Sequence, residues 1–573
     1  MNFLKSYLYK YWRTASVALL FLTFEALCDL MQPTIMSKII DVGVANRDLG
    51  YVFRMGGLML LITALGAAAA SIRNVAASHV SQNFGRELRG DLYKKILSLS
   101  ARNLDRFDQA SLITRLTNDV SQVQMFVNGM MRIFVKAPLL CIGGLIMATR
   151  LNPELAVVLA VAVPVVGVLI VINMKVGFPY FKRVQKALDR VNGVMREYLS
   201  GVRVVKAFNR FDYEVAKFSG ANEEFQERSV AAARVIAVFS PIIMLTLNLG
   251  IVAVLWLGGI RVNEGEMQVG HIIAFTNYMT QILFSLMLIS MVFNMFVRAR
   301  ASAGRIGEVF AEENEMTWKE ERADSLAGKK GRVDFEGVSF QYDGEPVLKG
   351  ITFSCLPGEM VGIIGSTGSG KSSLVGLLPR FYDANEGTIK IDGEDVRTVD
   401  PKRLREKIAI VPQKMTLFTG TILENIKWGN ETATQAEIEQ AARMSEAHEF
   451  IAKTPDGYDT RLGQGGVNLS GGQKQRVSIA RALVRKPEIL ILDDSTSAVD
   501  VATEAKIKAS LKGYAKGLTC LLIAQRITSV IDADKIAVLD HGELVGLGTH
   551  EELFTSCEVY QQIYQSQIGK EVL

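Results

Sequence analysis

Six long apolar runs in the N-terminal part of the chain constrain its fold more than any other feature. A helix needs roughly 20 apolar residues to cross the hydrocarbon core of a bilayer. The runs lie at residues 15–37, 54–77, 130–149, 154–175, 232–257 and 271–296. Hydrophobic residues make up 49% of the chain and the mean hydropathy is +0.20, which is high for a soluble protein. Residues 1–310 are therefore predicted to form a membrane domain of six transmembrane helices.

Two long polar stretches between these runs indicate how the helices are oriented. Ser81–Gln124 and Lys175–Ala231 are rich in lysine and arginine, whereas the loops at 41–50, 150–153 and 261–269 are short. Basic residues favour the cytosolic side of a membrane. We therefore expect the long stretches and both termini to be cytosolic, and the chain to be a multi-pass protein of the cell membrane.

Two carboxylates, Glu25 and Asp29, interrupt the first apolar run. They are four residues apart and so share one face of a helix. Because a charge inside a membrane is costly, such residues usually face a cavity or a partner. One interpretation is a site for a cationic substrate, or a gate. The alternative is that they pair with Lys136 or Arg132 of the third helix, or lie near the membrane interface.

Charge and cysteine content exclude several other functions. The net charge of +5 over 573 residues is mild, and we expect no nucleic-acid partner. The cysteines show no C-x-x-C spacing, which argues against a zinc site or a disulfide framework. They are Cys28, Cys141, Cys355, Cys520 and Cys557.

A phosphate-binding loop lies in the C-terminal part of the chain. Gly365–Ser373 reads G-S-T-G-S-G-K-S-S and matches G-x-x-x-x-G-K-[ST]. It follows a β-like apolar run at 360–364 and precedes a helix-like run. Glycines let the backbone wrap a phosphate, and a following helix adds its N-terminal dipole. Lys371 is predicted to reach the β- and γ-phosphates of a nucleoside triphosphate, and the Ser372 hydroxyl to bind Mg²⁺.

Two further patterns extend this site. The strand-like run Ile489–Leu492 ends at Asp493 and Asp494. A carboxylate at the end of such a strand holds Mg²⁺, here Asp493, and the next position should hold a base that aligns water. Leu469–Gln473, L-S-G-G-Q, is a second glycine turn that opens a helix, and it implies a partner domain if it serves a second nucleotide. Residues 331–573 are predicted to be an α/β ATPase domain, joined to the membrane domain by a linker at 311–330.

Taken together, these motifs resemble those of ATP-binding cassette (ABC) exporter half-transporters over essentially the whole chain. The resemblance implies a type IV ABC exporter architecture, with six transmembrane helices followed by one P-loop ATPase domain. It identifies Ser497–Asp500 as the D-loop, and Phe107–Val120 and Leu199–Arg210 as the loops that carry coupling helices. The residues it assigns to ATP are Tyr342, Gly365, Ser366, Thr367, Gly368, Ser369, Gly370, Lys371, Ser372, Ser373 and Gln413, with the signature residues Ser470, Gly471, Gly472 and Gln473; Mg²⁺ would be held by Ser372, Gln413 and Asp493.

The departures from the family pattern fall at the catalytic positions. The family's catalytic glutamate is Asp494 here and its switch histidine is Gln525, while Gln464 replaces a glutamate often seen in a loop near the coupling helices. Aspartate withdraws the carboxylate by about 1.5 Å, one C–C bond. A displacement of about 1 Å can cost on the order of 100-fold in rate. Glutamine donates hydrogen bonds but cannot shuttle a proton as imidazole can.

In the family, each ATP lies between the phosphate loop of one domain and the signature of the other. We therefore expect a heterodimer with a second half-transporter, in which this chain supplies a degenerate site and an intact signature for the partner's site. The expected function is ATP-driven export of amphiphilic compounds, drug-like or lipid, by alternating access. The alternatives are a homodimeric exporter of lipid or peptide with slow hydrolysis, and an ATP-gated channel or regulator.

Overall fold

The computed structural model describes residues 2–314, 316, 331–342, 344–514 and 517–568. The chain forms two compact units. The first comprises Met1–Ser98 and Phe107–Glu313, and the second comprises Leu99–Arg106 and Asn314–Leu573. The predicted linker, residues 311–330, lies for the most part outside the described residues.

The first unit is helical. Among the described residues, six helices are long and apolar enough to cross a membrane, which confirms the predicted number. Its elements are α1 (Asn2–Lys10), α2 (Trp12–Lys38), η1 (Ile39–Val44), α3 (Leu49–Ser98), α5 (Gln109–Thr114), η2 (Arg115–Asp119), α6 (Val120–Gly129), η3 (Met130–Phe134), α7 (Lys136–Leu151), α8 (Ala156–Ser200), α9 (Val202–Ala207), α10 (Phe211–Asn263) and α11 (Val269–Ala311).

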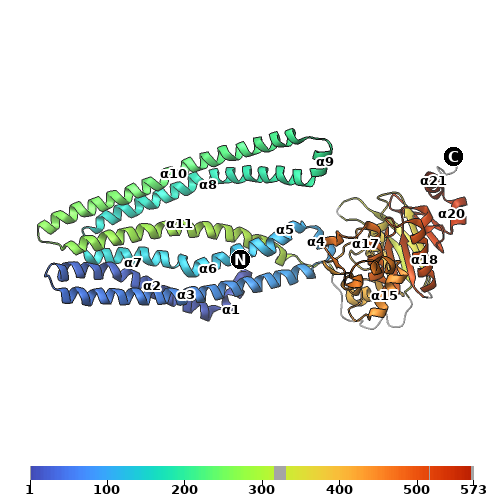
Figure 1. The fold of residues 1–573 in the computed structure, drawn as a ribbon, viewed down its shortest axis with the longest axis horizontal. Helices are drawn as coiled ribbons and strands as arrows, with labels where there is room; N and C mark the ends of the chain where they lie inside the picture. The colour runs from blue at the N-terminus through green and yellow to red at the C-terminus, as the bar shows by residue number, and fades with distance from the viewer. Residues whose placement is uncertain (1, 315, 317–330, 343, 515–516, 569–573) are drawn as a thin grey trace. The chain divides into compact units, whose positions relative to one another are not determined.

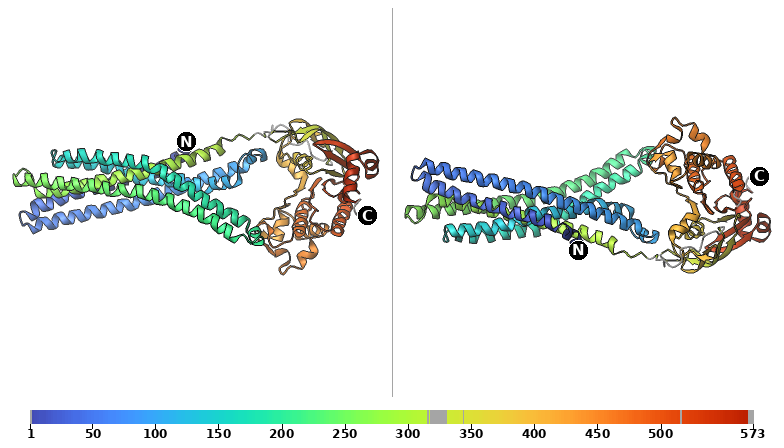
Figure 2. Two further views of the ribbon diagram at one scale, coloured as in Figure 1. Left: turned by 90° about the horizontal axis from the view of Figure 1, so that it is seen from above. Right: turned by 90° about the horizontal axis from the view of Figure 1, so that it is seen from below.

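Several of these helices are far longer than a membrane span. The 50 residues of α3 extend about 75 Å at the α-helical rise, against a hydrocarbon core of about 30 Å. The predicted polar stretches are thus continuations of the transmembrane helices. The short helix α9 joins α8 to α10 at one end of the bundle (Figure 1). In both views of Figure 2 the α8–α10 pair diverges from the α2–α3 pair toward that end.

The carboxylates of the first transmembrane helix are paired. Lys136 Nζ lies 2.5 Å from Glu25 Oε1 and 2.9 Å from Asp29 Oδ2. Arg73 from α3 reaches Glu25 Oε2 at 3.1 Å and also donates to the Arg132 carbonyl. Glu25 is only 6% exposed, so its charge needs these partners. The predicted pairing with Lys136 is confirmed, and it leaves the two carboxylates engaged inside the helix bundle.

The second unit is an α/β domain with two main sheets. The larger has the strand order β12-β11-β3-β10-β9-β6 and is parallel apart from β12; the smaller, β2-β1-β4-β5, is antiparallel. Its strands are β1 (Val333–Phe340), β2 (Leu348–Cys355), β3 (Met360–Gly365), β4 (Glu386–Ile391), β5 (Glu394–Asp395), β6 (Ile408–Val411), β7 (Gly420–Thr421), β8 (Arg461–Leu462), β9 (Ile489–Asp493), β10 (Thr519–Ile523), β11 (Lys535–Asp540) and β12 (Glu543–Gly548). Its helices are α4 (Ala101–Asp105), α12 (Lys371–Leu377), α13 (Pro401–Lys407), α14 (Ile422–Lys427), α15 (Gln435–Met444), α16 (His448–Ala452), η4 (Gly457–Asp459), η5 (Gln464–Gly466), α17 (Gly471–Leu483), α18 (Val501–Tyr514), α19 (Ile527–Val530), α20 (His550–Ser556) and α21 (Glu558–Gln567).

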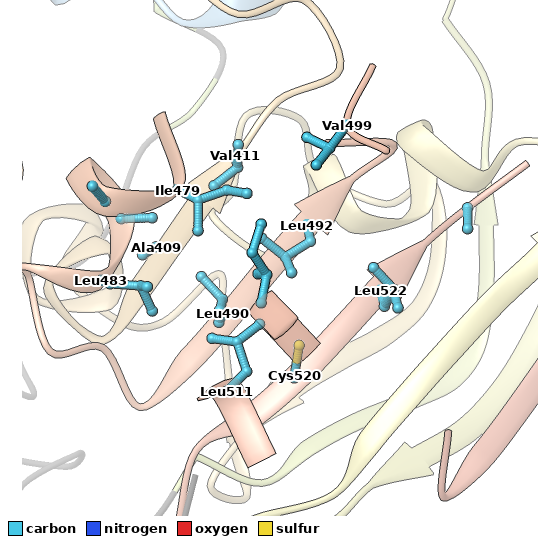
Figure 3. Close-up of a cluster of buried hydrophobic side chains, with 14 of the residues drawn as sticks. Ala409, Val411, Ile479, Leu483, Leu490, Leu492, Val499, Leu511, Cys520 and Leu522 are labelled. Atoms are coloured by element: carbon cyan, nitrogen blue, oxygen red, sulfur yellow. The ribbon is translucent and has the colours of Figure 1, made fainter. Parts of the chain in front are cut away.

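The parallel sheet is buried on both faces, so its central strands are continuous apolar runs rather than alternating ones. Every residue of β9 and β10 is buried. On one face Leu490 and Leu492 pack with Ile479 and Leu483 of α17 and Leu511 of α18 (Figure 3). This packing fixes the strands whose carboxyl ends carry the predicted ATP-site residues.

The short segment Leu99–Arg106 packs with the second unit although it lies between two stretches of the first. Ser100 caps its helix α4 by accepting a hydrogen bond from the Asn103 amide. Tyr382 Oη donates to Asp105 Oδ2 at 2.6 Å. The second unit is thus built from two separate stretches of the chain.

Candidate ATP site

The phosphate loop connects β3 to α12 in the strand–loop–helix arrangement expected from the sequence. Gly368 and Gly370 adopt φ values of +84° and +93°, a region that favours glycine. A Cβ on Gly370 would lie 2.6 Å from Leu348 Cδ2 and 2.9 Å from the Val347 carbonyl oxygen. The glycine is therefore required by both conformation and space.

Lys371 is folded back into the loop. Its Nζ donates to the carbonyls of Gly365 at 2.9 Å and Ser366 at 2.7 Å. The side chain is buried, and this burial lowers the pKa of Lys371. These carbonyls hold the ammonium at the mouth of the loop, where a phosphate oxygen would replace one of them.

Two of the predicted Mg²⁺ ligands meet at the carboxyl edge of the sheet. Ser372 Oγ donates to Asp493 Oδ1 at 2.9 Å. Asp493 ends β9, and burial raises the pKa of its carboxyl. A hydroxyl and a carboxylate side by side are hard oxygen ligands of the kind that Mg²⁺ takes together with water and phosphate. The donor set therefore fits the metal that an ATP site normally uses.

Asp494 lies at the centre of a hydrogen-bonded group. Its Oδ2 accepts from Gln525 Nε2 at 2.9 Å and from Gln413 Nε2 at 3.4 Å. The residue has φ +47°, in the left-handed region that non-glycine residues seldom adopt. Burial raises the pKa of its carboxyl. The structure thus brings together the predicted catalytic position, the switch position and the Q-loop glutamine on one carboxylate oxygen.

Tyr342 lies beside the end of the phosphate loop. Its Oη is 3.0 Å from Ser373 Oγ, and its ring makes edge-to-face contacts with Phe340 and Tyr382. The side chain is nevertheless 42% exposed. The position suits the predicted stacking role, because a fixed aromatic ring can receive a base on its open face.

The signature segment is already formed. Ser470 caps α17: its hydroxyl accepts from the Gln473 amide, and Gln473 Oε1 accepts from the Ser470 amide at 2.9 Å. Ser470 and Gly471 are exposed. Across the described residues, no hydrogen bond joins Ser470–Gln473 to this chain's own phosphate loop. The arrangement leaves the capped helix start open to solvent.

Two residues near the site were not singled out from the sequence. Arg526 Nη2 donates to the carbonyl of Ser497, the first D-loop residue, at 2.5 Å. Gln475 is 1% exposed and accepts from the Ala498 amide at 3.0 Å. Arg526 could have been found from the sequence, because it is a basic residue directly after the switch position. Gln475 gave none, because a glutamine in an amphipathic helix is ordinarily a surface residue.

Residues 16–287 match the family described as ABC transporter transmembrane region, and residues 348–497 match ABC transporter. An uncharacterised ABC transporter ATP-binding protein of Bacillus subtilis, YfiB, is 42% identical over 568 residues, which cover 99% of this chain and 98% of the relative. The ATP-dependent lipid A-core flippase of Chromohalobacter salexigens is 33% identical over 98% of this chain and 97% of its own length.

A solved structure of a bacterial Atm1-family ABC exporter with ATP bound superimposes with a TM-score of 0.81. It is 26% identical and covers 97% of this chain and 98% of that one. The chain therefore belongs to the ABC transporter family. It is an ABC exporter half-transporter with type IV architecture, a multi-pass membrane protein whose ATPase domain binds ATP, normally with Mg²⁺, and couples its hydrolysis to transport.

Proposed function

We propose that this chain is the ATP-holding subunit of a heterodimeric exporter. The observation that carries the proposal is the state of Asp494, a shortened carboxylate whose Oδ2 accepts from both Gln525 and Gln413. Every other residue expected to hold ATP and Mg²⁺ is present, and Ser372 and Asp493 are in contact. The site is therefore built to bind ATP and poorly built to cleave it.

The chemistry of the two departures supports slow hydrolysis. An attacking water needs a carboxylate at the right distance and a group that stabilises the γ-phosphate. Aspartate stops about 1.5 Å short of the position that glutamate reaches. The side-chain amide of Gln525 donates its hydrogen bond to that same carboxylate, and glutamine cannot carry the positive charge of an imidazolium. Both departures act against the same step.

The intact signature supports a partner of a different kind. Ser470–Gln473 form a capped helix start with exposed residues, and nothing in this segment departs from the family pattern. In a heterodimer this segment would complete the partner's site, where a glutamate and a histidine carry out the faster hydrolysis. ATP binding at both sites would turn the transport cavity outward, and hydrolysis at the partner's site would reset it. The difference in nucleotide affinity between the two states drives the switch.

The membrane unit supports an amphiphilic substrate, drug-like or lipid. A groove of about 480 Å³ between α8 and α10 is lined almost wholly by apolar side chains, among them Val158, Val161, Ala162 and Leu249. Glu25 and Asp29 are balanced by the two positive charges of Lys136 and Arg73, which makes them a poor site for a free cation. We further propose that both termini and the ATPase domain are cytosolic, because the long helix extensions carry the basic residues.

Purification of the full-length chain in lipid nanodiscs, alone and with co-expressed half-transporters, tests the proposal. Alone, the chain should bind ATP but hydrolyse it on the order of 100-fold more slowly than the assembled pair. Lys371→Ala serves as the control that removes binding. Strong ATPase activity from the chain alone would refute the heterodimer with a degenerate site. ATP-dependent accumulation of substrate against a gradient separates an exporter from an ATP-gated channel, which would pass only downhill current.

A further inference from the structure

One side chain of helix α21, that of Gln567, forms hydrogen bonds with the backbone of the segment Gln525–Ile527, which begins at the switch position. Gln567, the last residue of α21, donates from Nε2 to the Gln525 carbonyl at 2.8 Å and accepts at Oε1 from the Ile527 amide at 2.7 Å. The two bonds flank Arg526, which is extended, with φ −95° and ψ 131°. In an extended residue the polar groups on either side point the same way. The amide of Gln567 therefore pairs with the backbone as a neighbouring strand would.

The helix that carries Gln567 is firmly seated. Tyr560 is 0% exposed and its hydroxyl lies 2.8 Å from His550 Nδ1. Cys557 and Tyr560 belong to the buried cluster that also contains Leu492 of β9 and Leu522 of β10. Gln567 lies about two turns beyond Tyr560 on this helix; it is an exposed residue that is tied to the backbone at 525–527 by its two hydrogen bonds.

Two functional contacts start from the backbone segment Gln525–Ile527 and reach residues 494–497. The Gln525 side chain reaches Asp494 Oδ2 at 2.9 Å, and the Arg526 guanidinium reaches the carbonyl of the D-loop residue Ser497 at 2.5 Å. Both depend on the backbone at 525–527, because a side chain can reach its partner only from a fixed Cα position. A backbone that rotates here would break both contacts together.

We propose that Gln567 is a positioning residue for ATP hydrolysis. It fixes the backbone of Gln525–Ile527, so that one side chain meets the catalytic position of this site and the next holds the D-loop. Gln567 touches neither ATP nor the reacting atoms. This inference rests on the ATPase activity of the family and is independent of whether the partner is a second copy or a different chain.

The experiment uses the full-length chain purified alone in lipid nanodiscs, so that the hydrolysis measured comes from its own site and not from a partner's. Gln567→Met keeps the shape of the side chain and removes both hydrogen bonds. Gln567→Glu keeps an oxygen that can accept from the Ile527 amide, but it puts a carboxylate oxygen, which cannot donate, in place of the nitrogen that donates to the Gln525 carbonyl. Gln565→Met is the matched control, because Gln565 is an exposed residue on the same helix whose side chain makes no hydrogen bond among the described residues.

For each variant we would measure kcat and KM for ATP, the thermal midpoint, and hydrogen exchange of the peptide containing Ile527. Gln567→Met should lower kcat about 10-fold while KM stays within about twofold, since binding residues are untouched. The Ile527 amide should exchange faster, and the thermal midpoint and the Gln565→Met variant should match the wild type. Gln567→Glu should also lower kcat, because its carboxylate faces the Gln525 carbonyl.

Three results would overturn the proposal. These are unchanged exchange at Ile527 in Gln567→Met, a kcat within about twofold of wild type, and a fall in kcat that is matched by a lower thermal midpoint. Rapid hydrolysis by the chain alone would refute the heterodimer but leave this comparison intact. The two proposals therefore fail separately.

Discussion

Asp494→Glu combined with Gln525→His should convert the slow site into a competent one. In the wild type, Asp494 Oδ2 is held 2.9 Å from Gln525 Nε2, so the carboxylate faces the switch residue. With Asp494→Glu alone, the longer side chain must displace the Gln525 amide before it can reach a water at the γ-phosphate. The second substitution removes that amide and supplies an imidazole in its place.

The expected size of the effect follows from the length of the missing bond. Glutamate extends the carboxylate by about 1.5 Å, and a misplacement of about 1 Å costs on the order of 100-fold in rate. A 100-fold gain corresponds to about 2.7 kcal/mol of barrier, at about 1.36 kcal/mol for each factor of ten. We therefore expect about 10-fold from Asp494→Glu and about 100-fold from the double variant. Gln525→His alone should change little, because the carboxylate remains short. Residues that share a hydrogen bond seldom act additively.

Phosphate release by the full-length chain purified alone in lipid nanodiscs, followed against ATP concentration, measures this gain, because a partner's faster site would hide it in an assembled pair. Lys371→Ala in the double-variant background is the control, because it removes ATP binding at this loop alone and should abolish the added activity. A rate within about twofold of wild type, with ATP binding retained, would show that these two positions do not limit hydrolysis. The proposal of a degenerate site would then be wrong.

Three further predictions concern binding, the membrane unit and pH. Lys371→Ala should abolish binding of a fluorescent ATP analogue by the chain purified alone, because it removes the ammonium that lies inside the loop and donates to the carbonyls of Gly365 and Ser366. Glu25→Gln should destabilise the membrane unit by about 3 kcal/mol, the usual cost of breaking a buried ion pair, because Arg73 loses its carboxylate while Lys136 keeps Asp29; the loss should be seen as a lower thermal midpoint in detergent. Asp493→Asn should raise the thermal midpoint of the nucleotide-free protein by a few degrees at neutral pH while weakening Mg²⁺-dependent ATP binding. Burial raises the pKa of the Asp493 carboxyl, so the folded state favours its protonated form. The free energy of unfolding of the wild type should therefore fall as the pH rises from the unfolded-state pKa of this group through its folded-state pKa. Asp493→Asn should lack this contribution to the pH dependence when thermal midpoints are measured from about pH 4 to 8.

Local patterns predicted much of the fold. The run before Gly365 is a strand and the run after it a helix, because the loop motif and its flanks are contiguous. Apolar and polar residues alternate over 332–340 and 350–355, a pattern typical of half-exposed strands, and β1 and β2 cover these residues closely. The apolar runs predicted the number of membrane-spanning helices. They did not predict how long each helix is: α3 has 50 residues because the polar residues after its apolar run continue the same helix.

Contacts between distant residues could not be predicted in this way. Gln567 lies 42 positions from Gln525, and neither residue type nor spacing links the two. Tyr382 and Asp105 are 277 positions apart. The pairing of Glu25 with Lys136 was foreseen only as one of two interpretations, because a buried carboxylate requires a partner without specifying which one.

The placement of Leu99–Arg106 in the second unit has a practical consequence for dissecting this protein. A soluble fragment that begins after the linker, at about residue 331, contains all the ATP motifs but lacks α4. In that fragment the Tyr382 hydroxyl loses its acceptor, Asp105. The second unit is therefore discontinuous in sequence, and a fragment that begins after the linker lacks a contact that the full chain makes within it.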